Sequence, residues 1–85
     1  MNDVVIHPRV IERHPELSED DVREAWNGYV RMTRRGSNQI LALGFDGKGR
    51  AVEMVAKESC GDYLVYHAMT PPTQGALLEL GLVRR

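Results

Sequence analysis

The chain contains one cysteine, Cys60, among its 85 residues, so an intramolecular disulfide is excluded. The shortage of cysteine also argues against a metal site built from thiolates. No apolar run is long enough to cross a bilayer, and Met1–Asn2–Asp3 shows no signal-peptide pattern. We therefore expect a soluble protein of the reducing cytoplasm, with no membrane partner.

Metal and phosphate motifs are also lacking. The seven-residue spacing of His7 and His14 would suit one side of a helix, but Pro15 interrupts that helix. The stretch GFDGKG (44–49) has glycines and a lysine, but it lacks the spacing of a phosphate-binding loop and the helix that follows one. We expect no metal and no cofactor.

The length of the chain predicts a single domain over residues 1–85. A chain of this size has a thin core and lies just above the size range in which small folds need extra support. A partner chain or a second copy would therefore contribute to its stability.

Charge is segregated along the chain, although the formal net charge is only −1. Residues 1–28 contain seven acidic residues and three arginines, a balance of −4. Residues 29–50 contain one acidic residue and five basic ones, a balance of +4: Arg31, Arg34, Arg35, Lys48 and Arg50. Such a cationic segment can guide a polyanion or an acidic partner to one face. The alternative is a solvated hairpin whose arginines aid solubility.

Two short helices are predicted in the first third of the chain. Pro8 suits the first position of a helix, and Pro15 ends that helix, because the residue before a proline avoids the α region. Ser18 is the expected N-cap of the second helix, with Asp21 completing a shortened capping box. The predicted buried stripe recurs at helical spacing: Val22, Ala25, Trp26 and Tyr29.

After Gly28 the pattern changes to that of strands. Four strands are predicted between the turn signals GSN, DGKG and CGD: 29–35, 39–46, 50–58 and 63–70. Such short connections join antiparallel neighbours in a meander. In the third strand, one face is expected to be drier than the other, since Val52, Met54 and Ala56 alternate with Glu53, Val55 and Lys57.

A closing helix is predicted over residues 71–82, with Gly81 as its C-terminal cap. Its apolar side consists of Ala76, Leu77 and Leu80. The predicted fold class is therefore α+β: two N-terminal helices, a four-stranded antiparallel sheet and a C-terminal helix, with the helices on one face of the sheet.

His67 lies near the end of the fourth predicted strand, and Arg50 begins the third. Because these strands run antiparallel, we expect both residues towards the same end of the sheet. An imidazole that moves a proton and a cation that binds phosphate are what RNA cleavage requires. Glu53, Lys57 and Tyr66 would join them, depending on the register.

Each candidate also has a structural interpretation. His67 would hydrogen-bond a neighbouring carbonyl or hydroxyl group, and Arg50 would pair with Asp46 or Asp62. Tyr63 and Tyr66 would pack in the sheet, and Glu53 and Lys57 would form an exposed ion pair worth only ~0.2–1 kcal/mol.

Three stretches together resemble the BrnT-type toxins of bacterial toxin–antitoxin pairs, within the RelE-like ribonuclease group: RHPELSEDDVREAW, ILALGFDGKGRAVEMVA and YLVYHAM. The first resembles the family's helix ending in a basic residue and a histidine, here Arg13 and His14, before a capped second helix. The second resembles its central hairpin, with Arg50 after the turn. The similarity covers nearly the whole chain.

The resemblance implies a RelE-like fold and a ribonuclease that inhibits translation and is kept inactive by an antitoxin encoded beside it. Arg50 corresponds best to the basic residues on the family's RNA-binding sheet. Many members end the last strand with a serine–alanine–arginine run, where this chain has His67–Ala68–Met69–Thr70. Either His67 replaces the missing arginine in proton transfer, or the chain is a relative that only binds.

Two hypotheses of different classes follow. In the first, the chain is a metal-independent endoribonuclease toxin in which Arg50 and His67 are catalytic, acting on RNA that is free or bound to the ribosome. Three arginines guide RNA or bind an acidic segment of the antitoxin: Arg31, Arg34 and Arg35. Lys57 joins them in binding RNA. In the second, it is a non-catalytic interaction domain that pairs with itself, as a homodimer, or with another protein, along an exposed sheet edge or the basic hairpin.

Overall fold

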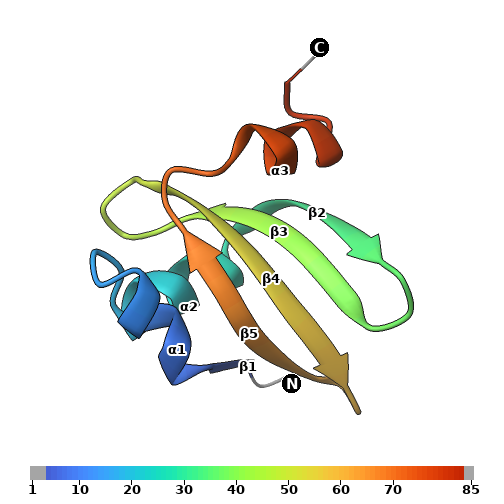
Figure 1. Cartoon of the computed structure of the whole chain (residues 1–85), viewed down its shortest axis with the longest axis horizontal. Helices are drawn as coiled ribbons and strands as arrows, with labels where there is room; N and C mark the ends of the chain where they lie inside the picture. Colours follow the sequence, from blue (N-terminus) through green and yellow to red (C-terminus); the bar gives the residue numbers. More distant parts are fainter. Residues whose placement is uncertain (1–3, 84–85) are drawn as a thin grey trace.

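The computed structural model describes residues 4–83, which form a five-stranded mixed sheet with three helices (Figure 1). In chain order the elements are β1 (Val4–Ile6), α1 (Pro8–Arg13), α2 (Glu19–Asn27), β2 (Tyr29–Arg35), β3 (Gln39–Phe45), β4 (Ala51–Ser59), β5 (Asp62–Met69) and α3 (Gln74–Glu79). The strand order in the sheet is β1-β5-β4-β3-β2. The predicted α+β class is confirmed. None of the three described helices is long and apolar enough to span a membrane.

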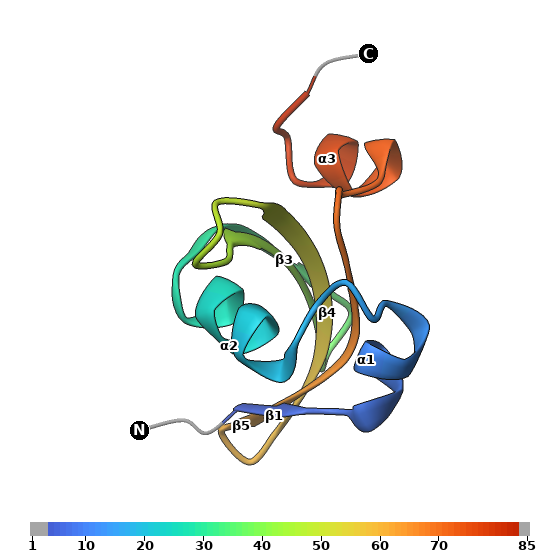
Figure 2. The same cartoon turned by 90° about the vertical axis from the view of Figure 1, so that its left-hand side faces the viewer.

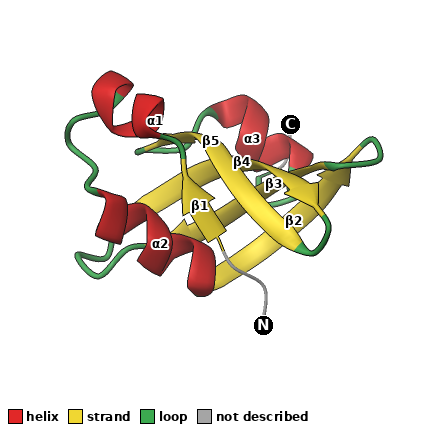
Figure 3. Ribbon diagram, turned by 90° about the horizontal axis from the view of Figure 1, so that it is seen from below, coloured by secondary structure: helices red, strands yellow, loops and turns green. Residues whose placement is uncertain are grey.

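The four predicted strands form the expected antiparallel meander, β2 to β5, but the prediction of a purely antiparallel four-stranded sheet is wrong. β1 adds a fifth strand, which pairs parallel to β5, from Val4 beside Tyr63 to Ile6 beside Val65 (Figure 3). Three residues are too few to show a strand period. β1 therefore depends on its pairing with a distant segment, and periodicity does not reveal it.

Both N-terminal helices form as expected. Pro8 occupies the first turn of α1, and Pro15 follows soon after its end. Ser18 caps α2 by accepting a hydrogen bond from the Asp21 N–H at 3.1 Å, while the Asp21 carboxylate accepts one from the Ser18 N–H at 2.9 Å. This reciprocal capping box is the one predicted.

The helices do not all cover one face of the sheet, which corrects the prediction. α2 packs on one face, where its buried residues Val22 and Ala25 join the larger core. α3 packs on the other face, through Ala76 and Leu80 (Figure 2). The physical reason is that the central strands are apolar on both sides: Val52, Met54 and Ala56 face α2, while Leu41, Leu43 and Val55 face α3.

The predicted stripe of α2 is only partly buried. Trp26 is half-buried against the core, and Tyr29 belongs to β2 and is 49% exposed. α2 lies very close to β3 at Gly44, where an added Cβ would come within 1.9 Å of the Ala25 carbonyl oxygen. Only glycine fits there, so this contact fixes the position of α2 on the sheet.

α3 ends as the sequence predicts. Gly81 has a φ of 73°, and its N–H donates to the Leu78 carbonyl, while the Leu82 N–H donates to the Leu77 carbonyl. These two bonds form a Schellman motif. At the other end, the Thr73 side chain caps the helix by accepting from the Ala76 N–H at 3.2 Å. Thr73 also contacts the candidate site.

Candidate active site

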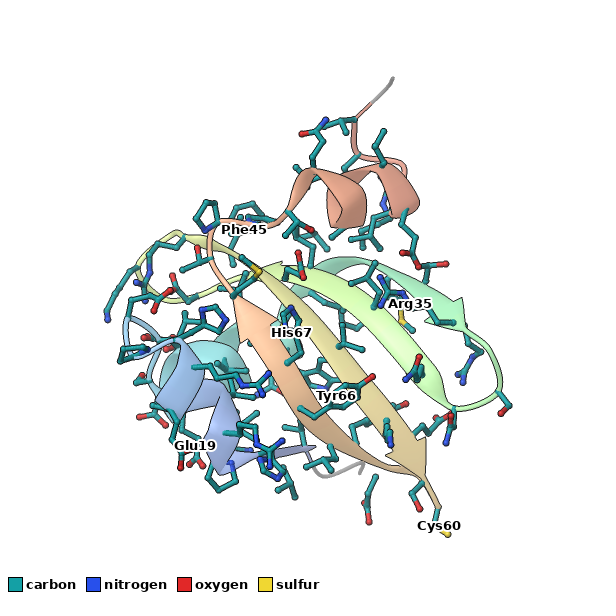
Figure 4. All side chains as sticks on the ribbon, viewed as in Figure 1. Glu19, Arg35, Phe45, Cys60, Tyr66 and His67 are labelled. Carbon is teal, nitrogen blue, oxygen red and sulfur yellow. The ribbon has the colours of Figure 1, made fainter. Side chains whose placement is uncertain are left out.

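A cleft of about 360 Å³ lies where α1 meets β5 and the α3 side of the sheet. Figure 4 shows His67 and Tyr66 on β5, with Arg35 on β2 farther across the sheet. The cleft brings together side chains from α1, β2, β4 and β5 and from the residue that follows α1: Val10, Arg13, His14, Arg35, Glu53, Val55, Tyr66, His67 and Ala68.

A β-bulge in β5 brings Tyr66 and His67 to the same cleft. Val55 pairs with His67, but its neighbour Ala56 pairs with Val65, so Tyr66 is the extra residue. In a regular strand, successive side chains point to opposite faces, and one of the two would point towards α2. The bulge changes this alternation, which is how bulges redirect side chains next to active sites.

His67 is held by a buried carboxylate. Its Nε2 lies 2.7 Å from Oε2 of Glu53, which projects from β4 on the same face. The His67 side chain is 34% exposed, whereas the Glu53 side chain is 8% exposed. His67 is therefore hydrogen-bonded, as its structural interpretation expected, but to a carboxylate and not to a carbonyl or hydroxyl group, and its ring also faces the cleft.

The other oxygen of the Glu53 carboxylate is hydrogen-bonded as well. Oε1 accepts hydrogen bonds from the Thr73 N–H at 2.9 Å and from the Thr73 hydroxyl at 2.8 Å. Burial alone would raise the pKa of Glu53, but the hydrogen bonds from Thr73 and His67 outweigh it and hold that pKa below the usual value. An ionised Glu53 can only accept, so His67 Nε2 carries a hydrogen and donates it.

Arg35 crosses the sheet to the cleft and is paired with α3. Its Nε and one terminal nitrogen each donate to the Glu79 carboxylate at 2.7 Å. These bidentate bonds raise the pKa of Arg35 and lower the pKa of Glu79. Glu79 and Thr73 thus connect both ends of α3 to residues that line the cleft.

Arg13 supplies a second guanidinium group from the last turn of α1. Within residues 4–83, no carboxylate pairs with it. Two cations therefore border the cleft, one neutralised by Glu79 and one available to an anionic ligand.

His14 follows α1 directly and also lines the cleft. Its ring stands edge-on to that of His67, with the two centroids 6.3 Å apart and the planes at 88°. Nδ1 of His14 lies 3.6 Å from a carboxylate oxygen of Glu16, and the side chain is 28% exposed. Two of the chain's three histidines thus face one cleft.

Arg50, predicted to be catalytic beside His67, does not line this cleft. Its Nε donates to Asp46 at 2.8 Å, one terminal nitrogen donates to Asp21 at 3.1 Å, and the other donates to the Glu16 carbonyl at 3.0 Å. The pairing with Asp46 matches the structural alternative drawn from the sequence. Because these bonds connect the β3–β4 turn to α2, we assign Arg50 a structural role.

The other predicted RNA-binding cations are also engaged. Arg31 donates to the Leu80 carbonyl at 3.4 Å, and Arg34 pairs with Glu58 at 2.9 Å. Lys57 is exposed, and its ammonium lies 5.6 Å from the centroid of the Tyr66 ring. Of the four, only Arg35 lines the cleft, and Lys57 lies beside it through Tyr66.

Sequence reasoning did not place Arg13, His14 and Thr73 in the site. Arg13 and His14 come from the far end of the chain, and only the fold brings them to β5. A signal was present, because the RH pair belongs to the stretch that resembles the BrnT-type toxins. Thr73 gave no signal beyond its suitability as a helix cap.

Comparison with protein-family models, with curated proteins and with solved structures gives no significant match. The resemblance to the BrnT-type toxins stays a prediction from the sequence.

Proposed function

We propose that this chain is an endoribonuclease that cleaves RNA in the cleft without a metal ion. The observation that carries the proposal is the His67–Glu53 pair: an imidazole oriented by a buried carboxylate in the wall of a cleft bordered by Arg13 and Arg35. RNA cleavage needs a base near the 2′-hydroxyl and cations near the phosphate, and these side chains supply both.

The roles follow from the hydrogen bonds. With its Nε2 hydrogen donated to Glu53, a neutral His67 carries its lone pair on Nδ1, which accepts the proton of the 2′-hydroxyl. Glu53 then stabilises the imidazolium that forms. Arg13 and Arg35 bind the non-bridging phosphate oxygens, and a bound phosphate competes with Glu79 for Arg35.

The resemblance supplies the biological setting of this proposal. A ribonuclease of the BrnT type would act in the cytoplasm as the toxin of a toxin–antitoxin pair, cleave free or ribosome-associated RNA and so inhibit translation. Its protein partner would be the cognate antitoxin.

The proposal is tested by RNA cleavage with the freshly purified chain, on free RNA in the presence of EDTA and on translating ribosomes in the Mg²⁺ buffer that ribosomes require. His67→Gln is the matched variant, because its amide keeps a donor for Glu53 but cannot transfer a proton. We expect a loss of about 10²–10⁴-fold in cleavage rate. A folded parent that cuts neither substrate would contradict the proposal.

A second candidate function is protein binding along β2, and exposed apolar side chains at this edge of the sheet favour it. Tyr29, Val30 and Met32 are 49%, 56% and 37% exposed. Beside them, Trp26 and Tyr63 help to line a groove of about 240 Å³ on the α2 side of the sheet. An edge strand with apolar side chains can pair with a strand of an antitoxin or of a second copy.

Val30→Lys tests this candidate against Val5→Lys, a control of equal exposure (56%) on β1, at the opposite edge of the sheet. We expect only Val30→Lys to weaken self-association, measured by light scattering, or binding of the neighbouring gene product, measured by calorimetry. Equal behaviour of the two variants would argue against a β2 interface.

A further inference from the structure

The cleft contains two imidazoles, and the proposed function uses only one of them. We propose that His14 is the second proton-transfer group of the same reaction, acting as the general acid opposite His67. This inference rests on the proposed ribonuclease function and extends it, because it makes the cleavage a two-histidine reaction.

The backbone holds His14 firmly at the end of α1. Its N–H donates to the Val10 carbonyl at 3.0 Å, and its own carbonyl accepts from the Leu17 N–H at 2.9 Å. Pro15 further restricts its backbone. The ring is thus carried by a fixed segment of chain, as a catalytic group requires.

The distance between the two rings suits a shared phosphodiester. Their centroids are 6.3 Å apart, and a hydrogen bond of ~2.8 Å from each ring would reach a different oxygen of one phosphodiester. Both side chains are about one-third exposed, at 28% for His14 and 34% for His67, so each keeps a side open to the cleft.

The surrounding charges separate the two roles. Buried Glu53 holds Nε2 of His67 at 2.7 Å and fixes the ring that accepts a proton, whereas the more exposed Glu16 lies 3.6 Å from His14 Nδ1. Arg13 from α1, Arg35 from β2 and Tyr66 from β5 also face this space. The cations favour an anionic phosphate in the part of the cleft onto which both rings open.

The reaction then balances without any further reactant. His67 Nδ1 takes the 2′-hydroxyl proton as the 2′-oxygen forms a bond to phosphorus. The bond between phosphorus and the 5′-oxygen breaks, its electron pair stays on that oxygen, and His14 donates a proton to it. The products are a 2′,3′-cyclic phosphate and a 5′-hydroxyl end.

The experiment compares ordinary RNA with RNA carrying a sulfur in place of the 5′-bridging oxygen. A thiolate leaves without protonation, so this substrate needs no general acid. For His14→Ala we expect cleavage of ordinary RNA to fall about 10²–10³-fold, while cleavage of the sulfur substrate stays within a few-fold of the parent. His67→Ala should slow both substrates.

His7→Asn is the control, because His7 does not line the cleft and asparagine preserves its cap on the Arg9 N–H. Circular dichroism establishes that each variant is folded. If the parent cuts RNA and His14→Ala cuts it equally well, or is slowed equally on both substrates, the His14 role is overturned while the ribonuclease stands. A folded parent that cuts neither substrate overturns both.

Discussion

Asp46 and Glu53 are two buried carboxylates that the chain uses differently. Burial opposes ionisation of both, and hydrogen bonds nevertheless lower the pKa of each: from the Arg50 N–H and side chain and the Lys48 N–H for Asp46, and from Thr73 and His67 for Glu53. The Asp46 carboxylate stabilises the β3–β4 turn. The Glu53 carboxylate orients an imidazole that faces a cleft.

The two carboxylates differ in whether the side chain bound to them keeps a free nitrogen. Arg50 divides its guanidinium among Asp46, Asp21 and the Glu16 carbonyl, so each of its three nitrogens is bonded. His67 hydrogen-bonds Glu53 through Nε2, and its Nδ1 is left to bind a ligand. Charged groups in a folded chain are therefore better judged by their remaining hydrogen-bonding capacity than by their charge.

Arg50→Ala should have the largest effect on stability. The substitution leaves the buried carboxylates of Asp46 and Asp21 with fewer donors, and we expect a loss of roughly 2–3 kcal/mol in the free energy of unfolding. Urea denaturation measures it. Below the unfolding transition, RNA cleavage per folded molecule should match the parent. A well-folded Arg50→Ala that cannot cleave would restore the catalytic role suggested by the sequence.

Glu53→Gln should have the opposite effect, with a large loss of cleavage and a small loss of stability. A neutral amide cannot stabilise the imidazolium of His67, so we expect cleavage to fall about 10²-fold, with a stability loss of only about 1–2 kcal/mol. Asp46→Asn is the matched control, since it neutralises the other buried carboxylate and should leave the cleavage rate unchanged. Equal effects of the two variants on cleavage would remove the distinction between the two carboxylates.

Local signals in the sequence were sufficient for most elements of the fold. The cap at Ser18, the turn glycines and the Schellman end of α3 each depend on neighbouring residues, and so does the pairing of Arg50 with Asp46, four residues apart. These features can be predicted from the sequence because the residues that interact are close in the chain.

The candidate site was less predictable, because contacts between residues far apart in the chain form it. The bulge at Tyr66 decides which side chains face the cleft, and no residue type requires a bulge at that position. β1 is followed by α1, which brings Arg13 and the next residue, His14, to β5, and β1 itself forms only through pairing with β5. The sequence therefore singled out His67, which lines the cleft, but paired it with Arg50, which does not.

Acid should destabilise the Asp46 cluster in a recognisable way. Since the folded pKa of Asp46 is lowered, its ionised form contributes stability above the ordinary carboxyl range near ~4, and this contribution is lost as the pH falls through the folded pKa. The free energy of unfolding is measured from pH 6 to pH 2 for the parent and for Asp46→Asn. We expect it to fall less steeply in Asp46→Asn, by up to ~1.4 kcal/mol per pH unit. Parallel curves would mean that Asp46 has the same pKa in the folded and the unfolded chain.

The smallest expected effect separates two lysines, one beside the cleft and one in the Arg50 cluster. Lys57 lies over the Tyr66 ring beside the cleft, and Lys48 pairs with Asp21 in the Arg50 cluster at 3.3 Å. If single-stranded RNA passes over Tyr66, Lys57→Ala should raise KM a few-fold with kcat unchanged. It should also reduce the salt dependence of binding by about 0.7 in the log–log slope, the value for one phosphate contact. Lys48→Ala should change neither quantity. The reverse result would place the RNA along the β3–β4 turn and away from the cleft.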